Sequence, residues 1–221
     1  MENKSFTEEN YIKAIYAINE QTGKPVSTNS IADELKTKAS SVTEMLKRLK
    51  NKKHINYKKY QGVTLTKQGK EIALSIIRKH RLWETFLVDK LNFKWHQVHD
   101  IAEQLEHIVS EDLIEKLDKF LGQPKFDPHG DPIPDSRYRL SKKPTSMPLS
   151  AMKLGQSAKI VGVDDTNDDF LSYLSELGIG LGSRLKCKQI FKFDNTMSVV
   201  IKNKEILLPE SITSTLLVQI V

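Results

Sequence analysis

The sequence predicts a mainly α-helical chain with small β parts. Three observations support this. Apolar residues recur at helical spacing in several stretches of the first 121 residues, a strand-turn-strand signature interrupts them at residues 54–66, and short alternating strand patterns dominate after residue 149. With 221 residues, the chain is long enough for one to three small domains.

The N-terminal elements predict a winged helix-turn-helix. Residues 6–20 read as an amphipathic helix, and residues 30–35 and 40–52 as two short helices separated by a polar break. Residues 54–66 then read as two strands around a turn at Gly62, and Thr66 is placed to cap the next helix. The second short helix has apolar positions at helical spacing: Val42, Met45, Leu46 and Leu49.

Positive charge is concentrated in the same region. The chain has a formal net charge of +6, yet residues 36–70 hold eleven Lys or Arg residues and a single acid, Glu44. Such a cluster is typical of a nucleic-acid interface. On charge alone, a solvated lysine-rich face explains it equally well, but the helix-turn-helix pattern favours DNA.

In a winged helix-turn-helix, the helix beginning at residue 40 enters the major groove, and its N-terminal side chains meet the base edges. The outward candidates there are Ser40, Ser41, Thr43 and Glu44. Glu44 could accept a hydrogen bond from cytosine N4, or it could pair with Arg48 one turn later. Phosphate contacts from the helix and wing are expected at Lys47, Lys58, Lys59 and Tyr60.

The middle third predicts three helices, at residues 67–90, 94–110 and 112–121. They carry more apolar surface than a small winged helix can cover. A homodimer formed through this region would bury the remaining apolar surface, and its two-fold symmetry suits a palindromic DNA site.

Ligand-type side chains gather on these helices. If residues 94–110 form one helix, His99, Glu103, Glu106 and His107 share a single face, a set suited to a first-row divalent metal. Each histidine alone reads as a surface or hydrogen-bonded residue, but the concentration favours metal binding. Further candidates are His80 and Glu84, one turn apart, and Asp127 and His129 in the string FDPHGDPIP.

Other classes of protein find little support. HExxH, nucleophile-elbow and phosphate-loop patterns are absent from the sequence, so an enzyme is not expected, and a metal-dependent hydrolase is a remote alternative. The start of the chain lacks an apolar leader core, and no apolar run approaches the ~20 residues of a membrane span. The single cysteine, Cys187, suits a reducing compartment, so we expect a cytoplasmic protein without membrane partners.

Several strings resemble the diphtheria-toxin-repressor and manganese-transport-repressor family of metalloregulators. They are ENYIKAIY, SSVTEMLKRLK, YQGVTLTKQGK, RKHRLWETFL, VHDIAEQLEH and PHGDPIP, and the resemblance covers nearly the whole chain. It implies a metal-dependent, homodimeric repressor of metal-uptake genes with an SH3-like C-terminal barrel. The implied boundaries are 1–72 for DNA binding, 73–140 for metal binding and dimerisation, 141–148 for a linker and 149–221 for the barrel.

The resemblance also implies two metal sites. Glu103, where the iron-responsive branch has cysteine, favours harder ions. Mn(II) is therefore preferred, with Fe(II) as a second candidate, and Zn(II) could occupy the sites in vitro. The alternative is a structural or zinc-filled site without switching. The matching primary-site residues are Glu103, Glu106, His107 and Asn10. The matching ancillary residues are His80, Glu84, His99, Asp127, His129 and Asp164.

Three positions depart from the family pattern or stay ambiguous. Asn10 stands where relatives have Met or Asp. Its neighbour Glu9 could substitute for it as a ligand, although Glu9 is expected to point elsewhere on the helix. Lys13 stands where the manganese branch has a glutamate, and a protonated lysine is no ligand. Asp164 reads equally well as a turn aspartate.

Overall fold

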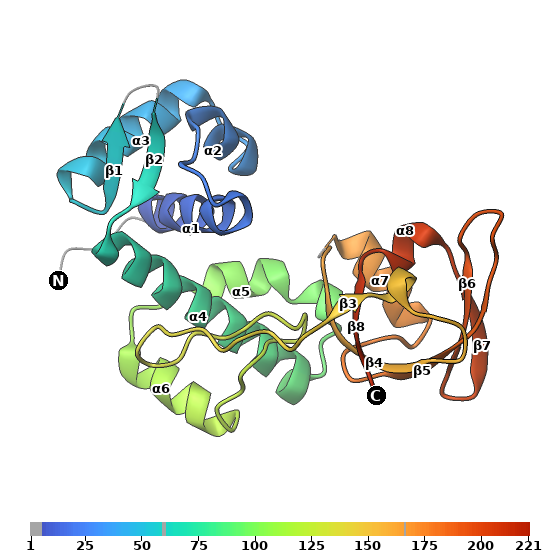
Figure 1. Ribbon diagram of the computed structural model, residues 1–221. Coiled ribbons are helices and arrows are strands. Elements are labelled where there is room, and N and C mark those ends of the chain that lie inside the picture. The colour runs from blue at the N-terminus through green and yellow to red at the C-terminus, as the bar shows by residue number, and fades with distance from the viewer. Residues whose placement is uncertain (1–5, 59–60, 166) are drawn as a thin grey trace. The chain divides into compact units, whose positions relative to one another are not determined.

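The structure, a computed structural model, describes residues 6–58, 61–165 and 167–221 (Figure 1). Its contacts divide the chain into two compact units. The N-terminal unit comprises Met1–His80, Glu106–Val109 and Pro134–Arg139. The C-terminal unit comprises Arg81–Leu105, Ser110–Ile133 and Leu140–Val221.

The predicted winged helix-turn-helix is confirmed in the N-terminal unit. The hairpin pairs antiparallel, with Ile55 opposite Leu65. Thr66 caps the following helix, because its hydroxyl accepts a hydrogen bond from the Gly69 amide at 3.1 Å. Ser27 caps the second helix in the same way. The elements are α1 (Phe6–Thr22), α2 (Thr28–Glu34), α3 (Ala39–Asn51), β1 (Ile55–Lys58) and β2 (Gly62–Leu65).

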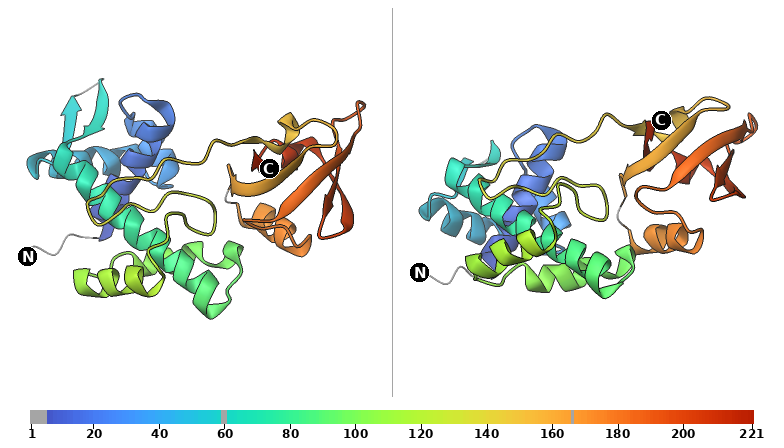
Figure 2. Two further views of the ribbon diagram at one scale, coloured as in Figure 1. Left: turned by 60° about the horizontal axis from the view of Figure 1, so that its bottom comes forward. Right: turned by 90° about the horizontal axis from the view of Figure 1, so that it is seen from below.

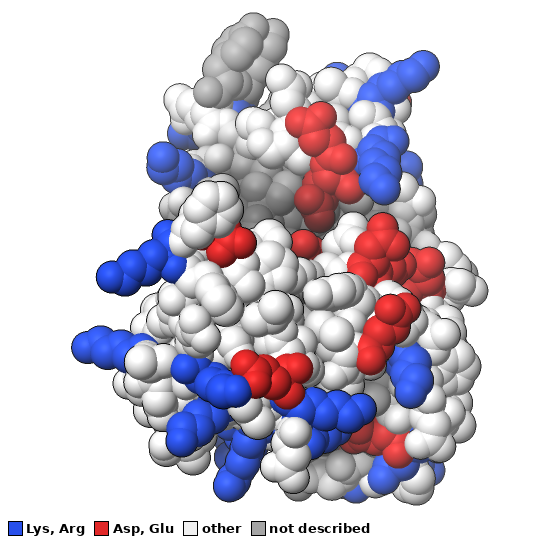
Figure 3. Space-filling model, turned by 90° about the vertical axis from the view of Figure 1, so that its right-hand side faces the viewer, with Lys and Arg blue, Asp and Glu red and all other residues white. Residues whose placement is uncertain are grey.

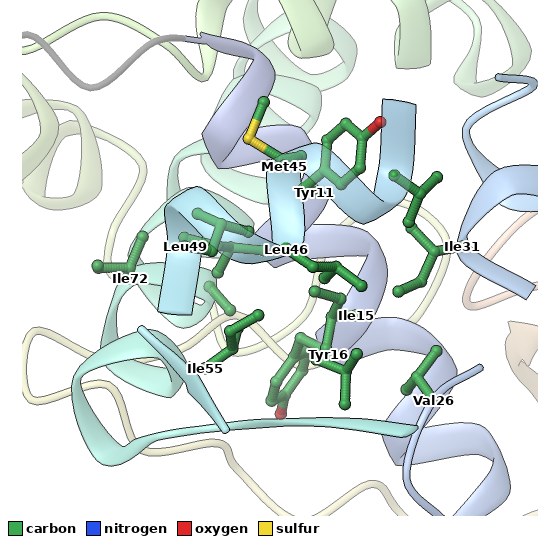
Figure 4. Close-up of a cluster of buried hydrophobic side chains, with 14 of the residues drawn as sticks. Tyr11, Ile15, Tyr16, Val26, Ile31, Met45, Leu46, Leu49, Ile55 and Ile72 are labelled. Carbon is green, nitrogen blue, oxygen red and sulfur yellow. The ribbon is translucent and has the colours of Figure 1, made fainter. Parts of the chain in front are cut away.

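One apolar core holds these elements together (Figure 4). The inner faces of α1 and α3 supply about half of its buried residues, and every residue predicted for the α3 face is buried. Burying such side chains stabilises the fold by about 1.5–3 kcal/mol each. The labelled residues are Tyr11, Ile15, Tyr16, Val26, Ile31, Met45, Leu46, Leu49, Ile55 and Ile72.

The helical middle differs from the prediction in one respect. The long helix α4 (Lys67–Leu91) and the later helix α6 (Glu111–Phe120) lie where expected, and Ser110 caps α6. The expected helix at 94–110 is wrong in its extent. It is a 3₁₀ turn, η1 (Trp95–Gln97), followed by a short α5 (His99–Leu105) that stops before Glu106.

The C-terminal region forms a six-stranded antiparallel sheet in the order β3-β8-β4-β5-β6-β7, with α7 packed against it (Figure 2). This confirms the expected SH3-like fold. The alternating patterns in the sequence predict strands within residues 152–163, 183–191, 196–203 and 204–212, and they miss the last strand. The elements are β3 (Met147–Pro148), η2 (Leu149–Ala151), β4 (Ser157–Val163), α7 (Asp168–Glu176), β5 (Arg184–Ile190), β6 (Met197–Ile201), β7 (Lys204–Leu208), α8 (Glu210–Thr213) and β8 (Leu216–Ile220).

Within the C-terminal unit, Trp95 anchors η1 to the sheet domain. Its ring is buried in the core of that domain, and its indole N–H lies 3.0 Å from the Leu171 carbonyl and 2.7 Å from the Ser175 hydroxyl. A second connection runs from the Val163 amide to the carbonyl of His129 at 3.3 Å. The loop that carries His129 is therefore bonded directly to β4.

Charge of both signs lies on the face drawn in Figure 3, where Lys and Arg side chains are interspersed with Asp and Glu side chains. That face is therefore mixed in charge, whereas residues 36–70 are almost uniformly positive. Among the described helices, none is both long enough and apolar enough to cross a membrane.

Candidate metal centre and DNA interface

Three predicted ligands converge inside the C-terminal unit. Glu84 comes from α4, and Asp127 and His129 come from the proline-containing loop after α6. Each offers one ligand atom, and these three atoms lie within 4.8 Å of one another. The side chains are buried, with 2%, 4% and 5% of their residue surface exposed, respectively. Two carboxylates buried this close together require a positive charge nearby.

Neighbouring groups orient the His129 ring. Its Nε2 lies 3.0 Å from the Trp95 carbonyl, and because a carbonyl only accepts, Nε2 donates. The other nitrogen, Nδ1, then faces the Glu84 carboxylate at 3.6 Å. A histidine held through one N–H by a carbonyl presents its other nitrogen in a fixed direction, as metal-binding histidines do.

Asp127 is held by the loop around it. Its Oδ1 accepts hydrogen bonds from the amides of His129 at 2.8 Å and Asp131 at 3.0 Å. Its Oδ2 lies 3.3 Å from Arg81 Nε. Asp127 also lines a cavity of about 550 Å³.

The cluster holds a proton strongly. Burial opposes charging of the His129 ring, but the hydrogen bond and charge of Glu84, helped by Asp127, outweigh burial and raise the pKa of His129 to about 9. Burial, together with the charge of Glu84, raises the pKa of Asp127 to about 6. Near neutral pH, a protonated imidazole therefore balances the carboxylates.

We expect metal binding at this cluster to depend on pH. A metal needs neutral His129, so below a pKa of about 9 each pH unit upward should tighten Mn(II) binding about tenfold. Below pH 6, Asp127 adds a second competing proton. Calorimetric Mn(II) titrations at several pH values between 6 and 9 measure the slope. An affinity that is constant over this range would refute the assignment of His129.

The other predicted ligands outside this cluster differ in their exposure and contacts. His99 and Glu103 are half exposed; His99 Nδ1 lies 3.5 Å from Glu84, and its Nε2 lies 3.6 Å from Glu103. Asp164 is exposed at the end of β4, where its amide bonds to the Thr215 carbonyl. His80 lies one turn before Glu84 on α4, and its Nδ1 contacts Glu106 at 2.6 Å.

Glu106 and His107 face α1 within the N-terminal unit. Lys13 Nζ lies 2.8 and 2.9 Å from the two oxygens of the fully buried Glu106. His107 Nδ1 lies 2.7 Å from Glu9, and its ring stacks on Phe6 with centroids 4.6 Å apart. Burial alone would raise the pKa of Glu106, but the contact with His80 and the charge of Lys13 outweigh it and lower that pKa.

Two expectations about this region are therefore wrong. Glu106 and His107 do not share a helical face with His99 and Glu103, because α5 ends at Leu105. Glu9 does not point away: it is buried against His107, whereas Asn10 is exposed. Sequence reasoning missed Glu9 and Lys13 as contacts of this segment, although their spacing of four residues placed both on one face of α1.

The residues around Glu106 do not fit a metal ion as they stand. Among the described residues, neither Glu106 nor His107 belongs to a group of three ligand atoms within 4.8 Å. Both oxygens of Glu106 already face the Lys13 ammonium. The Glu84–Asp127–His129 cluster, with two carboxylates and one imidazole, does fit a divalent ion.

The reading helix exposes most of its predicted side chains. Ser40, Ser41, Glu44 and Lys47 are exposed on α3, and Lys58 is exposed at the end of β1. The half-buried Thr43 donates its hydroxyl proton to the Ala39 carbonyl at 2.9 Å. Arg48 bonds to Glu8 of α1 at 3.2 Å rather than to Glu44. Lys59 and Tyr60 lie outside the described residues.

Comparison with known proteins agrees with this organisation. Residues 5–63 match the family described as "Iron dependent repressor, N-terminal DNA binding domain". Residues 66–135 match "Iron dependent repressor, metal binding and dimerisation domain", and residues 147–220 match the FeoA domain. A winged helix-turn-helix joined to a metal-binding dimerisation domain defines a class of metal-dependent DNA-binding regulators.

Individual relatives agree. A solved manganese-dependent transcriptional repressor in complex with manganese is 33% identical, covers 97% of this chain and 100% of its own, and superposes with a TM-score of 0.80. The structure of ScaR with bound Zn²⁺ is 31% identical over 97% of this chain and 99% of its own, with a TM-score of 0.72. The chain belongs to the diphtheria-toxin-repressor family of iron- and manganese-dependent repressors.

Curated sequences give shorter matches. The iron-dependent repressor IdeR of Mycobacterium tuberculosis (strain ATCC 25618 / H37Rv) is 34% identical over 128 residues, which are 58% of this chain and 55% of that protein. The diphtheria toxin repressor of Corynebacterium efficiens is 28% identical over 192 residues, 81% of each chain. The chain thus spans little more than half the length of the first of these relatives.

Proposed function

We propose that this protein is a homodimeric, metal-dependent transcriptional repressor that binds a palindromic operator, and that the Glu84–Asp127–His129 cluster holds its regulatory metal. The observation that carries the proposal is the convergence of these three buried ligand-type groups in a chain with a basic winged helix-turn-helix. The names of its relatives, iron- and manganese-dependent repressors, support the same function.

Mn(II) is the metal we favour. Two carboxylates and one imidazole form a hard to borderline donor set, and no thiol is nearby, because the only cysteine, Cys187, is buried in the sheet domain. Fe(II) is the second candidate. Zn(II) binds such sites tightly in vitro, and a relative was solved with Zn²⁺.

The primary site implied by the resemblance, Glu103, Glu106, His107 and Asn10, remains a second candidate. Its support is the match to the family pattern. The arrangement around Glu106 favours the other cluster, because Lys13 and His80 already satisfy that carboxylate. The family pattern also supports the domain boundaries at residues 72, 140 and 148. It further supports Asp164 as a ligand of the ancillary site.

Within the cluster, each residue has a distinct task. The loop amides hold Asp127 in place, and the Trp95 carbonyl holds the His129 ring so that Nδ1 faces Glu84. A bound divalent ion would supply positive charge between the carboxylates, where protonated His129 now supplies it. Since the His129 carbonyl bonds to Val163, ordering this loop also orders the docking of the sheet domain.

Metal can favour the DNA-binding state only as far as it binds that state more tightly than the other. A DNA partner supports the cytoplasm as the location that we propose for this protein. A metal-dependent hydrolase is the rival function, and a turnover screen with Mn(II) or Zn(II) would detect it. The names of the relatives favour a regulator rather than an enzyme.

DNA binding should require metal. We expect Mn(II) to tighten binding to a palindromic duplex selected from a random library at least tenfold, and a chelator to reverse it, because a coupling free energy of 1–3 kcal/mol corresponds to about 5–150-fold. Fluorescence anisotropy with Mn(II), Fe(II), Zn(II) and chelator in parallel measures the effect. Tight binding that chelator leaves unchanged would contradict a metal switch.

A further inference from the structure

One face of α1 contacts the segment after α5 through three side chains. Phe6, Glu9 and Lys13 are spaced three and four residues apart, so they lie on one side of the helix. Phe6 stacks on His107, Glu9 bonds to His107, and Lys13 bonds to Glu106. The DNA-binding helices are therefore tied to Glu106–Val109 by protein groups alone.

The Lys13–Glu106 pair is the strongest of these contacts. The ammonium lies within 2.9 Å of both carboxylate oxygens. Side-chain exposure is 22% for Lys13 and 1% for Glu106, so water screens the pair poorly. A buried carboxylate needs a cation nearby, and here the chain itself provides one.

We propose that Lys13 is a built-in cation that takes the place of a metal ion at Glu106, joining α1 to this segment without metal. Metal dependence then resides in the Glu84–Asp127–His129 cluster and not at Glu106. The regulatory part of this inference rests on the proposed function. The claim that Lys13 replaces a metal ion at Glu106 does not.

A divalent ion could bind Glu106 only by displacing the ammonium from both oxygens. Lys13 would then remain close to a doubly charged ion in a poorly screened setting. Repulsion between the Lys13 ammonium and an ion held a few ångströms away would weaken binding of that ion on the order of 100-fold or more. The neutral Asn10, exposed on α1, supplies no compensating charge.

The test is the number of Mn(II) ions bound per full-length chain, measured by equilibrium dialysis. We expect one tight ion in the unaltered protein and two in Lys13→Met, which keeps the length of the side chain but removes its charge. Lys13→Arg should restore one, because it restores the cation. Lys188→Met is the matched control: this exposed lysine pairs with Glu205 on the sheet, and its loss should leave one ion.

Thermal unfolding gives a second measurement. In chelator, Lys13→Met should melt several degrees below the unaltered chain, and Mn(II) should recover that loss, because the ion replaces the missing cation. A second tight ion in the unaltered chain that is lost in Glu106→Gln would overturn the inference, even if Lys13→Met failed to fold. So would a single ion in a folded Lys13→Met. Failure of the proposed function would be visible separately, as DNA binding indifferent to chelator.

Discussion

Replacing His129 with alanine is expected to abolish the Mn(II) dependence of DNA binding. The substitution removes the only imidazole among three buried ligand groups and leaves Glu84 beside Asp127. Removing even an outer partner of a metal ligand typically costs 10–100-fold in metal affinity, so loss of the ligand itself should cost about 100-fold or more. Calorimetry measures the affinity, and anisotropy measures DNA binding.

The control for this experiment is His96→Ala. His96 is a half-buried histidine of the same unit, on η1, and its Nδ1 lies 3.4 Å from the Ser175 hydroxyl, a contact outside the cluster. We expect it to leave Mn(II) affinity unchanged. His129→Gln adds a variant of similar size if the alanine variant unfolds. Full Mn(II) activation in either His129 variant would show that the metal acts elsewhere.

The sequence predicted the local parts of the fold well. The α3 residues Val42, Met45 and Leu46 recur at helical spacing, and all three are buried as expected. Such periodicity depends only on the helix and its inner face, so it is readable without tertiary information. The strand Leu216–Ile220 was missed because its place is set by pairing with β3 and β4, which are distant in sequence.

The candidate site was predictable residue by residue but not as an arrangement. The sequence and the family resemblance named Glu84, Asp127 and His129 within a larger ancillary set, while only the fold brings their ligand atoms within 4.8 Å of one another. The end of α5 could not be read from the helical pattern. Glu106 leaves that pattern for partners that are 93 residues away on α1 and 26 residues away on α4.

The two candidate sites differ in how charge is balanced. At Glu106 the compensating cation is the ammonium of Lys13, which lies within 2.9 Å of both carboxylate oxygens. At Glu84–Asp127 it is the His129 imidazolium, whose pKa of about 9 lies close enough to neutrality for a metal to displace the proton. An exchangeable proton suits a site that must accept and release metal, whereas a lysine suits a permanent structural connection.

Replacing Gly130 with alanine is expected to destabilise the C-terminal unit and weaken metal binding together. Gly130 adopts φ +89°, and a Cβ there would lie 2.3 Å from the Val161 carbonyl oxygen and 2.7 Å from the Gly162 Cα. Backbone atoms cannot move aside as a flexible side chain can. The loop must therefore shift away from β4, taking the adjacent His129 with it.

The loss should be about 3 kcal/mol or more, since clash is added to left-handed strain of roughly 1–2 kcal/mol. Gly155→Ala is the matched control, because φ is +81° there but no atom lies within 4 Å of the added Cβ. It should lose only about 1 kcal/mol and keep its Mn(II) affinity. Chemical denaturation and Mn(II) titration of both variants measure this. Equal losses of stability in the two would mean that strain alone acts at Gly130, and that close packing of the loop on β4 does not position His129.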